Sequence, residues 1–239
     1  MKILITGGAS GLGKAITCLL AKQKNNTVYF TYHSSGDAAK EIEQNFPNTQ
    51  SFKVNFSNAD SLNDFIEKMT ELAPEVLINN AITGYTQNHF HKIDAAIFTN
   101  SFQINILPVL NITQKFISDR RKLKGGKIVT ILTSAIINKP PIGWSEYVAN
   151  KAYLHSMAKS WATENISFGI TSNCISPSFM QTNLTASTDS RLIESMINEN
   201  PNKQLLKEDE VANAVDFLVN ATSQINGQNI IINAAKDLI

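Results

Sequence analysis

Short apolar runs alternate along this chain with longer stretches in which apolar residues recur at helical spacing. Seven runs are rich in β-branched or aromatic residues and have the length of strands, namely residues 2–6, 27–32, 50–55, 76–79, 127–132, 171–175 and 229–232. Strands that alternate with helices form a parallel sheet covered by those helices. The pattern predicts an α/β protein of the Rossmann type, with a doubly wound, seven-stranded parallel sheet and helices on both faces.

Helical spacing is clearest between the third and fourth predicted strands. Leu62, Phe65 and Met69 fall on one face of a helix. Ser61 and Asp64 resemble a capping box at its start. We therefore predict that this helix begins at Ser61.

Further stretches of helical period cover residues 94–120, 145–168 and those after the acidic residues 208–210, whose charges favour a helix N-terminus. The segment 176–202 is the least regular and suits a mobile lid over a site. The chain has no internal repeat and no obvious interdomain linker. We expect a single domain spanning residues 1–239, which combines cofactor binding and catalysis.

Composition narrows the class of partner. The 239 residues are 43% hydrophobic, and 21 Lys and Arg oppose 20 Asp and Glu, so no strong field attracts nucleic acid or anionic lipid. The first apolar run is too short for a signal peptide, and no later segment is expected to reach the length of a membrane span. Cys18 and Cys174 suit neither a metal site nor a disulfide framework, and are expected to be buried thiols in a reducing compartment. We predict a cytoplasmic protein with small-molecule partners.

A glycine-rich turn lies between the first predicted strand and a helical pattern. Gly7 permits a tight exit from the strand, Gly11 allows the backbone to approach a pyrophosphate, and Gly13 allows the helix to pack closely on the strand. Ser10 and Leu12 belong to the same turn, whose helix N-terminus would face the phosphates. An ordinary strand-to-helix connection is the alternative, but this context favours dinucleotide binding.

The end of the second predicted strand bears on the choice of dinucleotide. An acidic residue there would hold the ribose 2′-hydroxyl of NAD, but residues 30–35 contain none. His33, Ser34 and Ser35 can instead donate hydrogen bonds to a 2′-phosphate. NADP(H) is therefore favoured. NAD(H) stays possible, because Ser10 stands where a basic residue would have strengthened the case and His33 would also suit a solvated turn.

Tyr147 and Lys151 are four residues apart, so on a helix they share one face. An ammonium beside a phenol stabilises the phenolate and lowers the pKa of the tyrosine from about 10 toward neutrality. A tyrosine tuned in this way can protonate a nascent alkoxide. The spacing alone is common on helix surfaces, and it gains weight here from the glycine turn.

Two further polar residues complete a candidate site. Ser134 follows a predicted strand, which places it at the carboxyl edge of the sheet, where it can donate a hydrogen bond to the same oxygen. It also suits a capping role. Asn105 lies in an apolar helical stretch and would need a buried partner, so a structural role is as consistent with its position as a catalytic one.

Together these motifs resemble the short-chain dehydrogenase/reductase family over nearly the whole chain, and within it most closely the bacterial 3-oxoacyl-[acyl-carrier-protein] reductases. The family's catalytic tetrad falls on Asn105, Ser134, Tyr147 and Lys151. The resemblance implies that Lys151 also binds the nicotinamide ribose and that Asn105 holds a water in a proton relay.

The resemblance also implies cofactor contacts outside the glycine turn, namely Asn55, Phe56, Asn80, Ala81, Pro177, Met180 and Thr182. Three departures from the family pattern occur near the expected cofactor. Ile82 and Ser178 replace glycines, and Ala234 with Ala235 stands where a glycine pair usually ends the last strand. Side chains added there are expected to reshape the pocket, which leaves the substrate open.

The resemblance implies an NADPH-dependent reductase of a 3-oxoacyl thioester on acyl carrier protein, in fatty acid biosynthesis. The basic cluster at residues 120–124 would suit an acidic carrier, although it also suits a solvated helix end. One alternative is a dehydrogenase of a sugar, polyol or other secondary alcohol. A second is a cofactor-binding or assembly subunit with little turnover, which the intact tetrad disfavours. Family members are usually tetramers, so a homotetramer or a dimer is expected.

Overall fold

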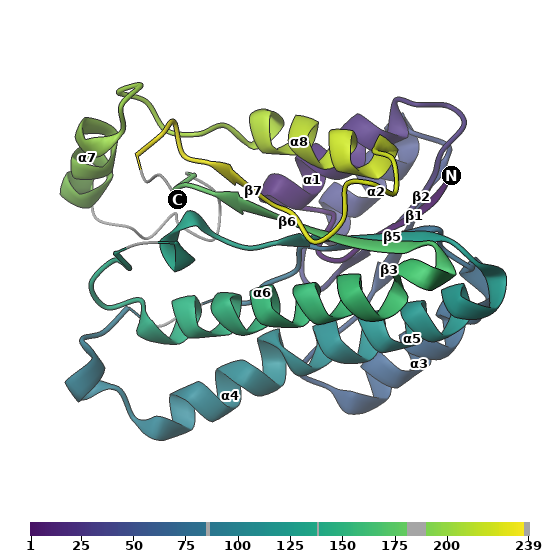
Figure 1. Cartoon of the computed structure of the whole chain (residues 1–239), viewed down its shortest axis with the longest axis horizontal. Helices are drawn as coiled ribbons and strands as arrows, with labels where there is room; N and C mark the ends of the chain where they lie inside the picture. The colour runs from purple at the N-terminus through teal and green to yellow at the C-terminus, as the bar shows by residue number, and fades with distance from the viewer. Residues whose placement is uncertain (85–86, 138, 181–189, 237–239) are drawn as a thin grey trace.

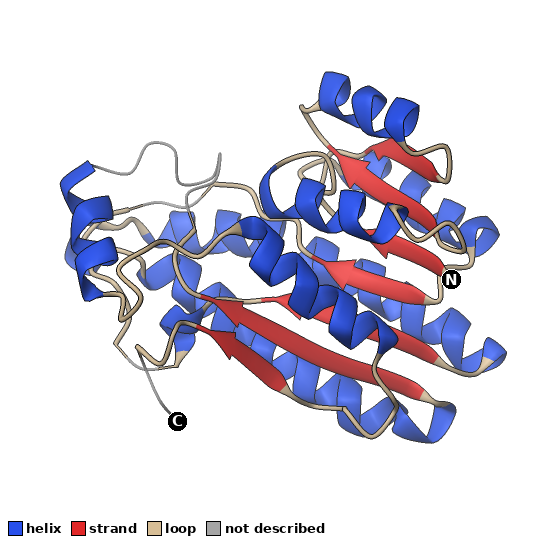
Figure 2. Ribbon diagram, turned by 90° about the horizontal axis from the view of Figure 1, so that it is seen from above, coloured by secondary structure: helices blue, strands red, loops and turns tan. Residues whose placement is uncertain are grey.

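The computed structural model describes residues 1–84, 87–137, 139–180 and 190–236. Seven parallel strands form one sheet in the order β3-β2-β1-β4-β5-β6-β7 (Figure 2). Their bounds are β1 Lys2–Ile5, β2 Thr27–Tyr32, β3 Thr49–Lys53, β4 Val76–Asn79, β5 Gly126–Ile131, β6 Ile170–Pro177 and β7 Asn229–Ile232. All seven predicted strands and their parallel arrangement are confirmed, with shifts only at their ends.

Helices cover both faces of this sheet, as predicted (Figure 1). One face carries α1 Gly11–Ala21, α2 Gly36–Asn45 and α8 Glu208–Asn220. The other carries α3 Ala59–Leu72, α5 Leu107–Leu123 and α6 Ser145–Asn165, with α4 Ala95–Asn105 leading into α5. The remaining elements are α7 Ser190–Glu199 and the short 3₁₀ helices η1 Phe90–Lys92, η2 Ser134–Ile136 and η3 Ile166–Phe168.

Side-chain alternation along the strands builds two separate cores. Ile3 and Ile5 of β1 pack with α1 and α8, whereas Leu4 between them packs on the opposite face, with Phe65 of α3 and Ile112 of α5. All five side chains are at least 96% buried. Because a central parallel strand is buried on both faces, its sequence is a continuous apolar run.

Two helix boundaries differ from the predictions. The capping box at Ser61 is wrong, because α3 begins earlier and Asn58 is its N-cap, with Oδ1 accepting a hydrogen bond from the Ser61 N–H at 2.8 Å. The predicted helix 94–120 is interrupted at Ile106, where α4 gives way to α5. Pro108 lies in the first turn of α5, where its missing N–H costs little, whereas it could not continue α4.

The expectation that no segment reaches membrane-span length is also wrong. The stretch Ala95–Leu123 has 29 residues and a mean hydropathy of 1.2 over its most apolar window. Part of this character belongs to the core, because Ile106, Val109 and Phe116 are buried under the sheet. Length and composition alone do not distinguish such a core helix from a membrane span.

The segment 176–202 is more regular than predicted, since β6 extends to Pro177 and α7 occupies Ser190–Glu199. Residues 181–189 lie outside the described residues, so a lid in this segment stays a prediction. The cysteines act as packing residues. Burial raises the pKa of Cys174 to about 12, and it also raises the pKa of the half-buried Cys18.

Candidate active site

A cavity of about 790 Å³ lies at the carboxyl ends of the strands, across the switch point between β1 and β4 where the strand order reverses. Its lining includes nearly every predicted site residue: Gly7, Ser10, Gly11, Leu12, Gly13, His33, Ser34, Asn55, Phe56, Asn80, Ala81, Asn105, Ser134, Tyr147, Lys151, Pro177 and Met180. Thr182 lies outside the described residues. The sequence motifs therefore converge on one place, although they come from most of the length of the chain.

Two glycines of the turn, Gly7 and Gly13, stand where a side chain is disfavoured. Gly7 has φ +68°, a backbone conformation that side chains disfavour. A Cβ on Gly13 would lie 1.9 Å from the carbonyl oxygen of Gly7 and 2.7 Å from Asn80 Nδ2. Ser10 is the N-cap of α1 but makes no side-chain capping bond, which leaves N–H groups of the first turn available to an anion. The turn fits a dinucleotide pyrophosphate.

Asn80 secures this turn from the neighbouring strand. Its side-chain Nδ2 donates to the carbonyl oxygens of Thr6 and Gly7 at 3.0 and 3.2 Å. The backbone N–H groups of Asn80 and Ala81 both donate to Thr6 Oγ1 at 3.0 Å. Because these bonds join the ends of β1 and β4, they hold the floor of the cavity at the switch point.

The end of the cavity beside β2 and β3 is rich in hydrogen-bond donors. His33, Ser34 and Ser35 follow β2, and Asn55 with Phe56 follows β3. Within the described part of the chain, neither β2 nor the turn after it contributes a carboxylate to the lining. This end can therefore take the adenosine part of a dinucleotide without repelling a 2′-phosphate.

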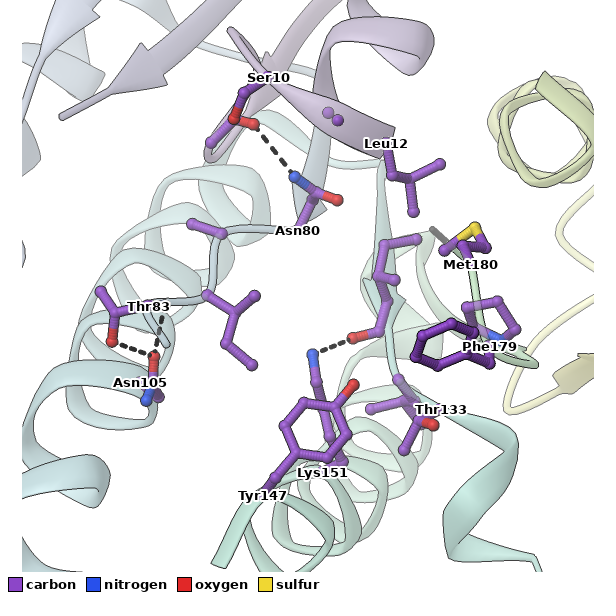
Figure 3. A pocket seen from close by; sticks show the side chains of 18 of the residues that line it. Ser10, Leu12, Asn80, Thr83, Asn105, Thr133, Tyr147, Lys151, Phe179 and Met180 are labelled. Carbon is purple, nitrogen blue, oxygen red and sulfur yellow. Dashed lines mark hydrogen bonds between the residues drawn. The ribbon is translucent and has the colours of Figure 1, made fainter. Parts of the chain in front are cut away.

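Tyr147 and Lys151 lie on one face of α6, as their spacing predicts (Figure 3). Lys151 is 5% exposed, and its Nζ donates to the carbonyl oxygen of Ile131 at 2.7 Å. The same Nζ lies 5.9 Å from the centre of the Tyr147 ring. Burial lowers the pKa of Lys151 to about 8. A strand carbonyl thus aims the ammonium at the cavity, beside the phenol.

Two adjacent hydroxyls follow β5. Ser134 is the first residue of η2, and Thr133 is its N-cap, with Oγ1 accepting a hydrogen bond from the Ala135 N–H at 3.3 Å. Both side chains line the cavity. Sequence reasoning missed Thr133, although its position two residues after Ile131, the end of the strand, was a signal that it too lies at the carboxyl edge.

Asn105 ends α4 and is 8% exposed. Its Oδ1 accepts hydrogen bonds from the N–H and the Oγ1 hydroxyl of Thr83, each at 2.9 Å (Figure 3). Thr83 lies in the loop after β4, so its position in the sequence did not identify it as the buried partner that Asn105 requires.

An aromatic group that the motifs did not predict borders the catalytic end. Trp144 packs edge-on against Tyr147, with ring centres 5.7 Å apart, and also contacts Phe179 at 6.3 Å. Ile82 and Ser178, which replace family glycines, also line the cavity. The side chains at these two positions therefore border the cavity.

Replacement of the usual glycine pair leaves strained backbone after β7. Ala234 and Ala235 have φ values of +54° and +60°, in the left-handed region that favours glycine. Ala235 N–H donates to Asn233 Oδ1 at 3.1 Å, which helps to fix the turn.

Comparison with known proteins agrees with this geometry. The chain matches the family model described as short chain dehydrogenase over residues 1–192. It belongs to the short-chain dehydrogenase family. This short-chain dehydrogenase is therefore an oxidoreductase of a family that uses NAD or NADP, as the resemblance predicted.

Individual relatives cover almost the whole chain. The 3-oxoacyl-[acyl-carrier-protein] reductase FabG of Staphylococcus epidermidis is 29% identical in an alignment 238 residues long that covers 96% of this chain and 96% of the relative. The acetoacetyl-CoA reductase of Allochromatium vinosum is 29% identical in an alignment 239 residues long, which again covers 96% of each protein. A short chain dehydrogenase from Burkholderia cenocepacia, solved in complex with NADP, superimposes with a TM-score of 0.87 at 22% identity, covering 99% of this chain and 97% of the other. The last likeness supports the fold.

Proposed function

We propose that this short-chain dehydrogenase is an NADPH-dependent reductase of 3-oxoacyl thioesters carried on acyl carrier protein, and that it forms the 3-hydroxyacyl product. The observation that carries the proposal is that Tyr147, Lys151 and the hydroxyls after β5 line the same cavity as the glycine turn. These groups can bind a nicotinamide dinucleotide and protonate an oxygen within one cavity.

The mechanism assigns each polar group a task. A nicotinamide dinucleotide held in this cavity would supply the hydride for the carbonyl carbon. Tyr147 donates its phenolic proton to the carbonyl oxygen, and Ser134 polarises that oxygen with a hydrogen bond. The Lys151 ammonium stabilises the phenolate that remains and binds the ribose. Asn105 holds a water that returns a proton toward Tyr147.

NADPH is favoured over NADH by charge. In NADPH the 2′-phosphate would lie at the donor-rich end of the cavity, beside His33, Ser34 and Ser35. A carboxylate at that position would accept from the 2′-hydroxyl of NADH, and the turn after β2 offers none.

The thioester is favoured by the two relatives whose names specify acyl thioester substrates. Trp144 and Phe179 give the end of the cavity beside Tyr147 an apolar surface suited to an acyl chain. The basic cluster at residues 120–124 does not support the proposal, because a carrier protein bound there would lie far from the cavity of the same chain. Arg120 donates to the carbonyl oxygens of Lys124 and Gly125, at the end of the sheet opposite the cavity.

The proposal is tested by following NADPH oxidation with acetoacetyl thioesters of acyl carrier protein and of coenzyme A, beside a panel of free ketones. We expect the thioesters to give the highest kcat/KM. We also expect kcat/KM to be higher with NADPH than with NADH. Equal rates with free ketones, or oxidation of sugars or polyols at higher kcat/KM, would favour the alcohol dehydrogenase alternative. Tight NADPH binding without turnover of any carbonyl would favour the subunit with little turnover.

Substitution of the paired hydroxyls tests which one polarises the substrate oxygen. If Ser134 has this role, Ser134→Ala is expected to lower kcat by about 10²-fold, the loss typical of one oxyanion donor, while Thr133→Val leaves kcat nearly unchanged. Steady-state kinetics with saturating NADPH measures both. A large loss of kcat in Thr133→Val with little change in Ser134→Ala would assign the role to Thr133 and show that the assignment of Ser134 is wrong.

We further propose that residues 1–239 act as one domain in a cytoplasmic homotetramer. β7 is an edge strand, and Ile230, Ile231 and Ile232 on it are only half-buried. Leu107 and Tyr153, on α5 and α6, are 40% and 38% exposed. Pairing of subunits through these two regions would cover both apolar surfaces.

A further inference from the structure

A buried carboxyl group lies directly before the proposed proton donor. Glu146 is 2% exposed on α6, where it faces α4. Its Oε1 accepts hydrogen bonds from the hydroxyl of Ser101, on α4, and from Asn150 Nδ2 at 3.0 Å. Carboxyl groups are rarely buried without polar partners, and none of these three residues belongs to the described lining of the cavity.

Ser101 is the centre of this group of residues. Besides donating to Glu146, its hydroxyl oxygen accepts from Asn105 Nδ2 at 3.2 Å and from Asn150 Nδ2 at 2.8 Å. A hydroxyl has one proton to donate and two lone pairs. All three are used, so the Ser101 hydroxyl has one orientation, which is set by the oxygen of Glu146 that receives its proton.

That orientation determines how the amide of Asn105 lies. Because Ser101 offers Asn105 only an acceptor, the amide turns Nδ2 toward Ser101 and presents Oδ1 to Thr83. With the opposite arrangement, the amide NH₂ group would face the N–H of Thr83 and a hydrogen bond would be lost. We infer that Glu146 is a positioning residue, which fixes the side chain of Asn105 through the hydroxyl of Ser101.

The inference rests on the proposed function, in which Asn105 supports proton return to Tyr147. Glu146 and Asn150 each immediately precede a proposed catalytic residue, so the network ties the end of α4 to the turn of α6 that carries the proton donor. Loss of Glu146 is therefore expected to disturb proton transfer, which depends on alignment, more than binding of NADPH.

The test compares Glu146→Ala, Glu146→Gln and Ser101→Ala by steady-state kinetics. Glu146→Ala and Ser101→Ala are expected to lower kcat by about 10- to 100-fold, with the KM for NADPH within about twofold of wild type, because alignment and not cofactor binding is lost. Glu146→Gln retains an acceptor oxygen for Ser101, so its kcat should stay within about threefold of wild type. The double variant of Ser101 and Glu146 should be no worse than either alanine variant.

Asn165→Ala is the matched control, because Asn165 is 1% exposed near the other end of α6 and bonds to Trp161 and Arg121, away from the described cavity lining. It should lower thermal stability without lowering kcat. If Glu146→Ala and Ser101→Ala behave like this control, the positioning role is overturned. If Glu146→Ala does not fold, Ser101→Ala and Glu146→Gln decide the outcome.

A second readout separates failure of the network from failure of the proposed function. In ¹⁵N spectra the side-chain NH₂ signals of Asn105 should be slowed in exchange with water in the wild type and in Asn165→Ala. They should lose that protection in Ser101→Ala. A wild type that reduces no carbonyl would end the proposed function while this measurement still tests the network, and unprotected Asn105 signals in the wild type would end the network.

Discussion

Tyr147→Phe is expected to abolish nearly all carbonyl reduction while leaving NADPH affinity close to that of the wild type. The substitution removes one oxygen and keeps the ring, so the edge-on contact with Trp144 survives. What is lost is the proton donor, and general acid catalysis by a positioned side chain contributes about 10²- to 10⁴-fold. Single-turnover reduction at saturating NADPH measures the loss directly, because it excludes product release.

Tyr153→Phe provides the matched control. Tyr153 lies on the same helix, is 38% exposed and packs edge-on against Phe102, but does not belong to the described cavity lining. Its variant should keep wild-type kinetics. If Tyr147→Phe retained more than about a tenth of the wild-type rate, the assignment of Tyr147 as the acid would be wrong.

Lys151→Met is expected to stabilise the protein at pH 7 while inactivating it. Burial lowers the pKa of Lys151 from 10.5 to about 8, which corresponds to about 3 kcal/mol of unfavourable free energy for the charged form in the folded state. Losing the hydrogen bond to Ile131 offsets about 1 kcal/mol of the gain. Thermal or urea unfolding should therefore show a net increase of about 2 kcal/mol in the free energy of unfolding.

The sign of this effect fixes its pH dependence. Below pH 8 the lysine is charged in both states, so the folded protein bears the full burial cost. Between about pH 8 and 10.5 the folded state releases the proton while the unfolded state keeps it, so wild-type stability rises relative to Lys151→Met. The gap between the two proteins should close across this window. An exposed lysine on the same helix, Lys159, serves as control, since Lys159→Met should show neither the gain nor the closing gap.

The sheet and the presence of the site were predictable because both depend on local patterns. Continuous apolar runs such as residues 76–78 occur where a strand is buried on both faces, and a glycine turn can be recognised because a side chain does not fit at Gly13. The residues at which helices begin were harder to predict from the sequence. Asn58 and Ser61 both suit an N-cap, and only the path of the chain after β3 decides between them.

Contacts between distant segments could not be predicted from spacing. The Ile131 carbonyl that aims Lys151 is 20 residues away in sequence, and the Thr83 groups that hold Asn105 are 22 residues away. A backbone carbonyl also has no residue-type signature. The tetrad was therefore identifiable as a set of residue types, whereas its supporting bonds required the three-dimensional structure.

The strand order has a consequence for how the molecule assembles during translation. β1 lies between β2 and β4, so the first strand made cannot gain its second neighbour until the ribosome has released residues up to Asn79. The phosphate-binding turn therefore stays open on one side while roughly the first third of the chain is synthesised. Tyr147 and Lys151 emerge later still, so the glycine turn and the Asn80 hydrogen bonds that secure it can form before the proposed proton donor has been synthesised.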